Sequence, residues 1–225
     1  LLFESDSQGE AALRFEISKY VYKSRGVIAS PEQIVIGAGS EYLYGLIVEL
    51  FGRHRTYAIE TPSYKKIEQV YKATEIDYEL LPLRSSGIDS KALAGTKANV
   101  LHTTPYRSYP SGVTATASKR HEYIRWSDKN DRYIIEDDFE SEFSLLKKNE
   151  ETLFGTTESD NIIYMNTFSK TIAPSIRIGY MVLPESLLQD FENKLGFYSC
   201  TVPTYIQLVL AELISSGEFE RHINR

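Results

Sequence analysis

One lysine stands out because of the residues around it. Lys170 lies between hydroxyl-bearing residues in the stretch NTFSKTIAPSIRIGY (residues 166–180), and Arg177 follows seven positions later. A lysine held near apolar walls can have its pKa lowered enough for the amine to act as a nucleophile and form a Schiff base with a carbonyl compound. A solvated loop lysine is the simpler interpretation. The rest of the sequence has to decide between the two.

A glycine-rich turn is the second feature of chemical interest. In GAGSEYLYGL (residues 37–46), Gly37 and Gly39 permit close approach of a ligand to the backbone. A helix that begins at Ser40 would present free N–H groups suited to a phosphate. A plain strand-to-helix turn explains the same glycines, and because no lysine follows them the segment is not a P-loop.

An aromatic residue and a run of carboxylates complete the candidates. Tyr64, on a turn after Pro62, either stacks on a flat ligand or covers the edge of the core. Several carboxylates follow the apolar run YIIE, and they fit a metal site, an acid/base pair or a solvated turn. The four histidines are scattered without ligand spacing, which disfavours a metal. A carboxylate that pairs with a protonated ring nitrogen fits better, and Asp137 is better placed for it than Asp138.

The elements that carry these residues alternate along the chain. Helical periodicity covers residues 10–25, 40–51, 63–71, 90–93 and 118–126, and apolar runs typical of strands cover residues 33–36, 57–59, 76–81, 100–103, 133–136, 161–166 and 176–184. Gly26 and Gly52 are placed to end the first two helices, and Ser40 is expected to cap the second. This alternation predicts βαβ units and a mainly parallel sheet with helices on both faces, whose ligands bind beyond the carboxyl ends of the strands.

Composition excludes several classes of function for this chain. Thirty-one acidic and 25 basic residues give a net charge of −6 without a basic cluster, so nothing here indicates binding to nucleic acid. A single cysteine, Cys200, excludes an internal disulfide. Because no apolar run is long enough to span a bilayer and no signal peptide opens the sequence, we expect no contact with a membrane and a cytoplasmic location.

Together, the separate features match the needs of pyridoxal phosphate. Its phosphate requires a helix N-terminus and a guanidinium, its ring requires a face for stacking, its nitrogen a carboxylate, and its aldehyde an amine. The turn at Gly39, Tyr64, Asp137, Lys170 and Arg177 supply one of each. Lys170 therefore becomes a candidate for covalent attachment of this cofactor.

The same stretches resemble a known family. IVIGAGSEYLYGL, ETPSYKKI, TTPYRSYPSGVTATASKRHEYIRWS, YIIEDDFESEF, NTFSKTIAPSIRIGYMVLP and SSGEFERHINR are similar to fold-type I pyridoxal phosphate proteins, and within them to the aminotransferase-like domain of MocR-type transcriptional regulators of the GntR superfamily. The resemblance implies that Lys170 forms the internal aldimine, Asp137 holds the pyridine nitrogen and Tyr64 stacks on the ring. The cofactor-binding residues it implies are Gly39, Ser40, Glu41, Tyr64, Asp137, Phe139, Thr167, Ser169, Lys170 and Arg177.

Two positions depart from the pattern of active aminotransferases. The family usually has a tyrosine two residues after the ring-binding aspartate, where this chain has Phe139, so we expect a hydrogen bond to the cofactor's phenolic oxygen to be missing. Typical aminotransferases have asparagine before the Pro-x-Gly of the loop, where this chain has Tyr109, as the regulators do. The resemblance therefore leaves open whether the chain completes transamination.

The resemblance also implies a domain organisation. We expect residues 1–225 to form an α/β fold, the three-layer α/β/α large domain of a pyridoxal phosphate-dependent aminotransferase with a mainly parallel sheet. The chain would be a fragment without the N-terminal winged helix-turn-helix, through which alone DNA would bind, and without the small C-terminal domain.

Three functions follow from this sequence, in order of preference. The first is a homodimeric regulator domain that senses an amine or amino acid through exchange at the cofactor. The second is a class I/II aminotransferase that acts on an amino acid. A serine-type acyl enzyme is disfavoured because Thr167 stands where the SxxK pattern requires serine.

Overall fold

A mainly parallel sheet forms the centre of the molecule. The structure, a computed structural model, describes residues 6–129, 131–139, 151–168 and 176–223. Within them the strands are β1 (Ile34–Gly37), β2 (Tyr57–Thr61), β3 (Tyr78–Arg84), β4 (Gly87–Ile88), β5 (Val100–Thr103), β6 (Tyr133–Asp137), β7 (Ile162–Thr167) and β8 (Gly179–Val182). They pair in the order β1-β8-β7-β6-β5-β2-β3-β4. Among these strands only β4 and β8 run against the rest, which confirms the predicted sheet.

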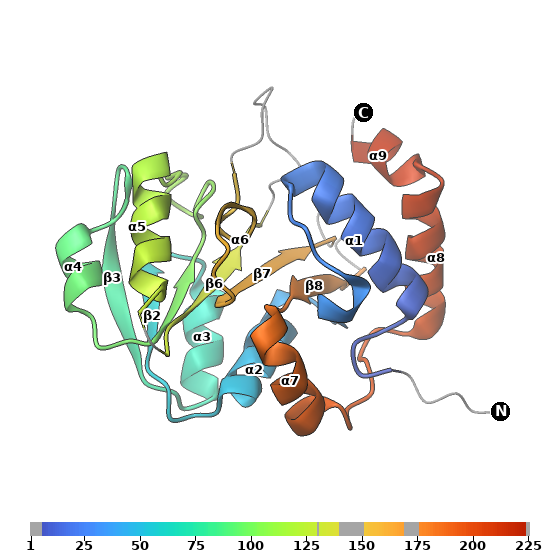
Figure 1. Cartoon of the computed structure of the whole chain (residues 1–225), viewed down its shortest axis with the longest axis horizontal. Coiled ribbons are helices and arrows are strands. Elements are labelled where there is room, and N and C mark those ends of the chain that lie inside the picture. Colours follow the sequence, from blue (N-terminus) through green and yellow to red (C-terminus); the bar gives the residue numbers. More distant parts are fainter. Residues whose placement is uncertain (1–5, 130, 140–150, 169–175, 224–225) are drawn as a thin grey trace.

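Helices cover both faces of the sheet (Figure 1). They are α1 (Ala11–Arg25), α2 (Ser40–Phe51), α3 (Lys65–Ala73), α4 (Ser90–Gly95), α5 (Ala117–Ser127), α6 (Leu153–Thr156), α7 (Leu188–Leu195), α8 (Thr204–Ser215) and α9 (Glu218–Ile223), with 3-10 turns at Pro31–Gln33 and Glu185–Leu187. One face packs against α2, α3 and α7. The other packs against α1, α8 and α9 at one end and α4, α5 and α6 at the other. The predicted three-layer α/β/α architecture is therefore confirmed.

Alternation along each strand explains why both faces are apolar. In β6, Ile135 packs on the α2 face and Ile134 on the α5 face, and in β8 Met181 and Tyr180 divide in the same way. Successive side chains of a strand point to opposite faces, so a strand covered on both sides is a continuous apolar run. This is the pattern that the sequence shows. No helix in the described part of the chain has both the length and the apolar composition needed to cross a membrane.

Glycines set the helix boundaries, with one departure from expectation. Gly26, at φ 67°, ends α1 in the left-handed conformation, and Gly52 ends α2. The predicted cap at Ser40 is wrong, because Gly39 occupies the N-cap position and no side chain caps the helix. Gly39 has φ 92°, and a Cβ there would lie 2.8 Å from Arg177 Nη2. This positive φ, which other residues rarely adopt, favours glycine at the N-cap.

Two strands differ from their predicted ranges by two or three residues at both ends. The predicted strand at residues 76–81 is shifted to Tyr78–Arg84, where it pairs with β2 as far as Pro82 and then with the short β4. The apolar run at residues 176–184 is a strand only over Gly179–Val182, which lies between β1 and β7. Pairing with neighbours, rather than the length of the apolar run, sets where each strand stops.

Candidate functional site

Several of the predicted site residues that the structure describes lie at one edge of the sheet. Parallel pairing brings together the carboxyl ends of β2, β5, β6 and β7, so Thr103 and Asp137 lie at the same edge. At the antiparallel end of the sheet Gly179 pairs with both Thr167 and Gly37, which brings the turn before α2 to this edge as well. Ligands of open α/β sheets bind at such an edge.

Asp137, the last residue of β6, is buried and held by a tyrosine. Tyr44 Oη donates a hydrogen bond of 2.5 Å to Asp137 Oδ2. Burial first, and then the charge of Asp137, raise the pKa of Tyr44 well above its ordinary value, so the hydroxyl remains a donor. Among the described residues no donor reaches the other oxygen, Oδ1. The carboxylate is therefore fixed through one oxygen while the second remains available to a ligand.

A histidine of the neighbouring strand lies beside the same carboxylate. His102 Nε2 lies 3.6 Å from Asp137 Oδ2, and His102 Nδ1 shares a hydrogen bond of 2.6 Å with the hydroxyl of Tyr71. The Tyr44 ring meets the His102 ring edge to face at 4.9 Å between centroids. All three side chains are completely or almost completely buried. The sequence analysis did not identify them, because tyrosines on helical apolar faces and a single strand histidine look like core residues.

Three aromatic rings, those of Tyr64, Tyr109 and Phe139, lie together. The rings of Tyr64 and Phe139 are nearly parallel, at 11° and 6.4 Å between centroids. Tyr109 meets Tyr64 edge to face at 6.2 Å and is exposed on its outer side. The structure thus brings together Tyr64, proposed to stack on a ligand ring, and both positions at which the chain departs from active aminotransferases.

A charged corner forms where α2 begins. Arg177 Nη2 donates to Glu41 Oε2 at 2.5 Å, and Lys66 Nζ donates to Glu41 Oε1. Gly39 lies against the same guanidinium. Glu41 is among the residues that the family resemblance assigns to cofactor binding, and in the structure its side chain is directed to Arg177.

Two of the predicted residues, Ser169 and Lys170, lie outside the described residues, so their roles remain predictions. The residues on either side of them are well anchored. Phe168 is buried among Tyr180 and Phe219, and its N–H donates to the carbonyl of Ile178 at 2.8 Å. Thr167, at the end of β7, is half-buried at the same edge, and its N–H donates to Asn166 Oδ1 at 2.7 Å.

A second carboxylate is buried near the edge, in β2. Glu60 accepts hydrogen bonds from Thr103 Oγ1, at 2.7 Å, and from Ser108 Oγ. Burial raises the pKa of Glu60 to about 7, although the two hydroxyls act in the opposite direction. The sequence analysis did not identify this residue. Its contacts tie β2 and β5 to the loop that carries Tyr109.

The carboxylates next to Asp137 point to the other face of the sheet. Arg25 Nε and Nη2 donate to the two oxygens of Asp138 at 2.6 and 3.1 Å, and Tyr164 Oη donates to Asp138 Oδ2 at 2.7 Å. Glu136 accepts from the N–H groups of residues 153 and 154, and burial raises its pKa to about 8. The preference for Asp137 over Asp138 therefore has a geometric basis. Within the described residues, no group of three or more histidine, cysteine or acidic side chains could hold a metal ion.

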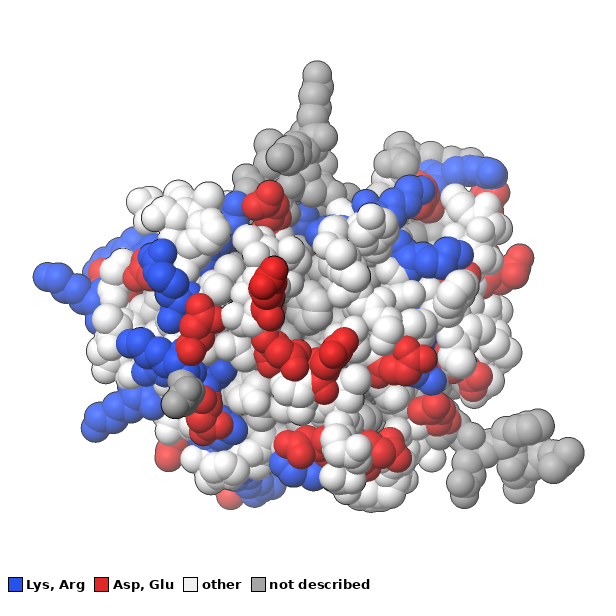
Figure 2. All heavy atoms as spheres, viewed as in Figure 1, with Lys and Arg blue, Asp and Glu red and all other residues white. Residues whose placement is uncertain are grey.

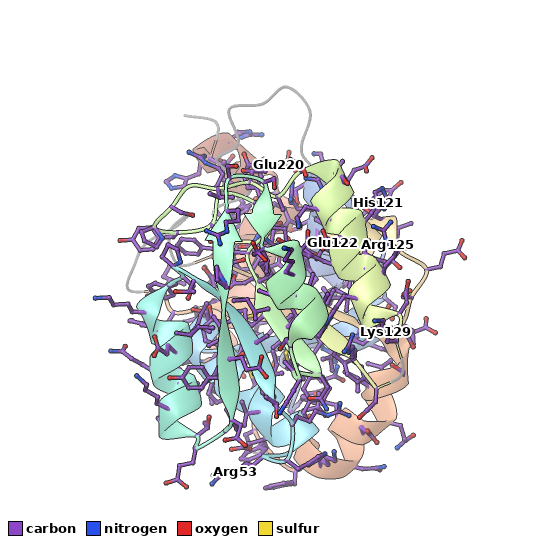
Figure 3. All side chains as sticks on the ribbon, turned by 90° about the vertical axis from the view of Figure 1, so that its left-hand side faces the viewer. Arg53, His121, Glu122, Arg125, Lys129 and Glu220 are labelled. Carbon is purple, nitrogen blue, oxygen red and sulfur yellow. The ribbon has the colours of Figure 1, made fainter. Side chains whose placement is uncertain are left out.

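The outer surface shows mixed charge. In the view of Figure 2, acidic and basic side chains are interspersed over the described part of the face. Figure 3 shows His121, Glu122 and Arg125 on α5 and Lys129 just beyond its end, and Glu122 pairs with Lys119 of the same helix. The four groups labelled there lie away from the edge that carries Asp137 and belong to the solvated surface.

Comparison with known proteins gives two kinds of relative. Residues 3–224 match the family described as aminotransferase class I and II. The chain is 35% identical over 217 residues to the HTH-type transcriptional regulator YdeL of Bacillus subtilis, covering 96% of this chain and 47% of that protein. It is 30% identical over 224 residues to the HTH-type pyridoxine biosynthesis transcriptional regulator PdxR of Corynebacterium glutamicum, covering 98% of this chain and 48% of that protein. The chain thus spans about half the length of these relatives.

Among solved structures, the chain is similar to a kynurenine aminotransferase of Pyrococcus horikoshii. The identity is 27% and the TM-score 0.87, over 99% of this chain and 57% of that chain. That enzyme was crystallised with PMP and with its substrate and product. The fold described above is therefore shared with proteins of this kind.

Proposed function

Since the chain belongs to the family of class I and II aminotransferases, we propose that it is the pyridoxal phosphate-binding, effector-sensing and dimerisation domain of a MocR/GntR-type transcriptional regulator. One observation carries the proposal. Nearly the whole chain aligns, at 35% and 30% identity, with about half of two HTH-type regulators. The DNA-binding part would lie in a segment of the whole protein outside residues 1–225, and a regulator that acts on DNA works in the cytoplasm.

The residues at the sheet edge fit the cofactor. Asp137 offers one carboxylate oxygen, Oδ1, that no described donor occupies, while Tyr44 fixes the other. The ring of Tyr64 is available for stacking, and Arg177 lies at the N-terminus of α2. These are the groups that a pyridinium nitrogen, an aromatic ring and a phosphate require. Gly39, Ser40, Thr167 and Ser169 would complete the phosphate site, and Lys170 would be the amine that binds the aldehyde.

Each residue has a limited task in this proposal. When bound, the cofactor would supply an aldehyde that can bind an amine, and Lys170 would be the residue of this chain that offers one. Asp137 would hold the ring nitrogen, and Tyr44 fixes the orientation of its carboxylate through a hydrogen bond. Glu60 positions the loop of Tyr109 over the same edge. Phe139 offers no hydroxyl to the site, so the effector would meet an apolar ring at this position.

Signalling requires that the bound states differ in conformational preference. An effector amine can shift the protein between two conformations only through different affinities for them. We propose that replacement of Lys170 by the effector amine at the cofactor supplies this difference. A homodimer would transmit it to the DNA-binding part of the whole protein.

An aminotransferase is the alternative function. The similarity to the kynurenine aminotransferase of Pyrococcus horikoshii favours it. Phe139 and Tyr109, which replace a hydroxyl and an amide of active enzymes, count against it. Titration of the purified chain with pyridoxal phosphate, and then with a panel of amines and amino acids, separates the two. A sensor shows a shift of the visible band without keto acid, whereas an aminotransferase accumulates keto acid and pyridoxamine phosphate.

A further inference from the structure

The carboxylate of Glu41 forms an ion pair with Arg177, the residue that is proposed to bind phosphate. Glu41 Oε2 lies 2.5 Å from Arg177 Nη2, and its other oxygen, Oε1, accepts from Lys66 Nζ. Glu41 is in the first turn of α2 and Lys66 in the first turn of α3, while Arg177 precedes β8. One side chain therefore bridges two cations that come from different parts of the chain.

The arrangement places two anions in competition. An acidic side chain in the first turn is favoured by the helix dipole, as is a bound phosphate. A phosphate at the start of α2 would compete with Glu41 for the charge of this guanidinium and for its Nη2, to which Glu41 is now bonded. Two like charges within a few ångströms repel each other, and the side chain of Glu41 is only 23% exposed, so water screens the repulsion incompletely.

Lys66 gives Glu41 a second partner. The hydrogen bond with Glu41 is the main cause that raises the pKa of Lys66, so the amine stays charged. Partial burial alone would raise the pKa of Glu41, but the bonds and charges of Lys66 and Arg177 lower it, so the carboxylate is also ionised. Because the two cations bind different oxygens, release of Arg177 leaves the pair of Glu41 and Lys66 intact.

We propose that Glu41 is an internal competitor for Arg177 that sets the affinity of the site for the phosphate of its ligand. When phosphate binds, Arg177 leaves Glu41 and pairs with the phosphate, while Glu41 stays paired with Lys66. The site then binds its phosphorylated ligand more weakly and releases it more readily than the same site without the carboxylate. This inference rests on the proposed function, because it takes pyridoxal phosphate as the ligand.

The test measures binding rather than activity. Dissociation constants for pyridoxal phosphate and for pyridoxal, which lacks the phosphate, are determined by absorbance titration of the intact chain and its variants. Removal of a partly buried competing charge in Glu41→Gln should lower the Kd for pyridoxal phosphate roughly three- to tenfold and leave that for pyridoxal unchanged. Glu68→Gln is the matched control, since Glu68 pairs with Lys72 on α3 and should change neither Kd.

A double-mutant cycle tests the role of Lys66. Lys66→Met should raise the Kd for pyridoxal phosphate, because Glu41 then binds Arg177 alone, and should have little effect when Glu41→Gln is also present. An equal effect of Lys66→Met in both backgrounds would mean that Lys66 contacts phosphate directly, and would overturn its proposed role.

The outcomes separate this inference from the proposed function. If pyridoxal phosphate binds and gives a visible band, but Glu41→Gln leaves its Kd unchanged or raises it, the competition is refuted and the proposed function survives. If Glu41→Gln tightens pyridoxal equally, the effect does not concern phosphate, and the inference is again refuted. If neither the natural chain nor any variant binds pyridoxal phosphate, both proposals are refuted.

Discussion

Asp137 and Asp138 are adjacent in the chain, yet replacing each by asparagine should affect different properties. Asp138→Asn should lower the stability of the fold, whereas Asp137→Asn should weaken ligand binding. The two substitutions make the same chemical change one residue apart, so each is the matched control for the other. Asp138 forms a two-bond ion pair with Arg25 in which the side chains are 2% and 3% exposed. Asp137 instead faces the ligand edge and receives one hydroxyl, that of Tyr44.

The size of each effect depends on which charged or polar group loses its partner. Asp138→Asn leaves the guanidinium of Arg25 buried without a counter-charge, and loss of one partner of a buried pair costs about 3–5 kcal/mol of unfolding free energy. For a chain of this size that lowers the Tm by about 6–20 °C. Asp137→Asn retains an oxygen that can accept from Tyr44, so its cost in stability should be near 1 kcal/mol. Its effect should be on ligand binding.

The assay is thermal and urea unfolding of the chain without added ligand, followed by titration with pyridoxal phosphate. Arg25→Met combined with Asp138→Asn should cost less than the sum of the single changes, because the second removes the charge that the first left unpaired. The reasoning is refuted if Asp138→Asn destabilises by less than about 1 kcal/mol, or if both asparagine variants lower stability equally.

Three further predictions concern the remaining contacts of the site. Tyr44→Phe removes a buried bond to a charged group and should weaken binding of pyridoxal phosphate about tenfold in equilibrium titration; an unchanged Kd would exclude the support of Asp137 by Tyr44. Gly39→Ala forces a side chain into a backbone at φ 92° and against Arg177, which should cost about 1–3 kcal/mol in urea unfolding, whereas Gly95→Ala, in open space, should not. The pKa of Glu60 is 4.5 in the unfolded chain and about 7 in the folded one, so between these pH values only the unfolded chain loses this proton. The free energy of unfolding should therefore fall as pH rises from about 4.5 to 7, by up to about 3 kcal/mol. Glu60→Gln should flatten this slope in unfolding measured across that range, and a slope unaffected by the substitution would exclude Glu60 as its source.

The sequence determined the architecture well because its evidence is local. Apolar runs that alternate with helical periodicity require a sheet covered on both faces, and the order of elements makes it parallel. Strand ends then mark the ligand edge, which is why Asp137 and the turn at Gly39 could be placed in advance. The predicted cap at Ser40 failed because the backbone at Gly39 takes φ 92°, a conformation that favours glycine and that hydrophobic periodicity does not reveal.

The contacts that fix the candidate site depend on residues far apart in sequence. Tyr44 and Asp137 are separated by 93 positions and Arg25 and Asp138 by 113. Tyr44 has the spacing of a core residue, and nothing in the helix shows that its hydroxyl reaches a carboxylate. Glu41 has the position of a backbone phosphate ligand, and only the fold shows its side chain on Arg177. Such pairs become visible when the elements are packed.

The most direct test of the account is the site of covalent attachment. The chain is incubated with near-stoichiometric pyridoxal phosphate, reduced with borohydride, digested and mapped by mass spectrometry, with Lys170→Ala treated in parallel. We predict a phosphopyridoxyl group on Lys170 and its absence from the variant. Attachment to another lysine such as Lys66, or no attachment, would contradict the proposed function.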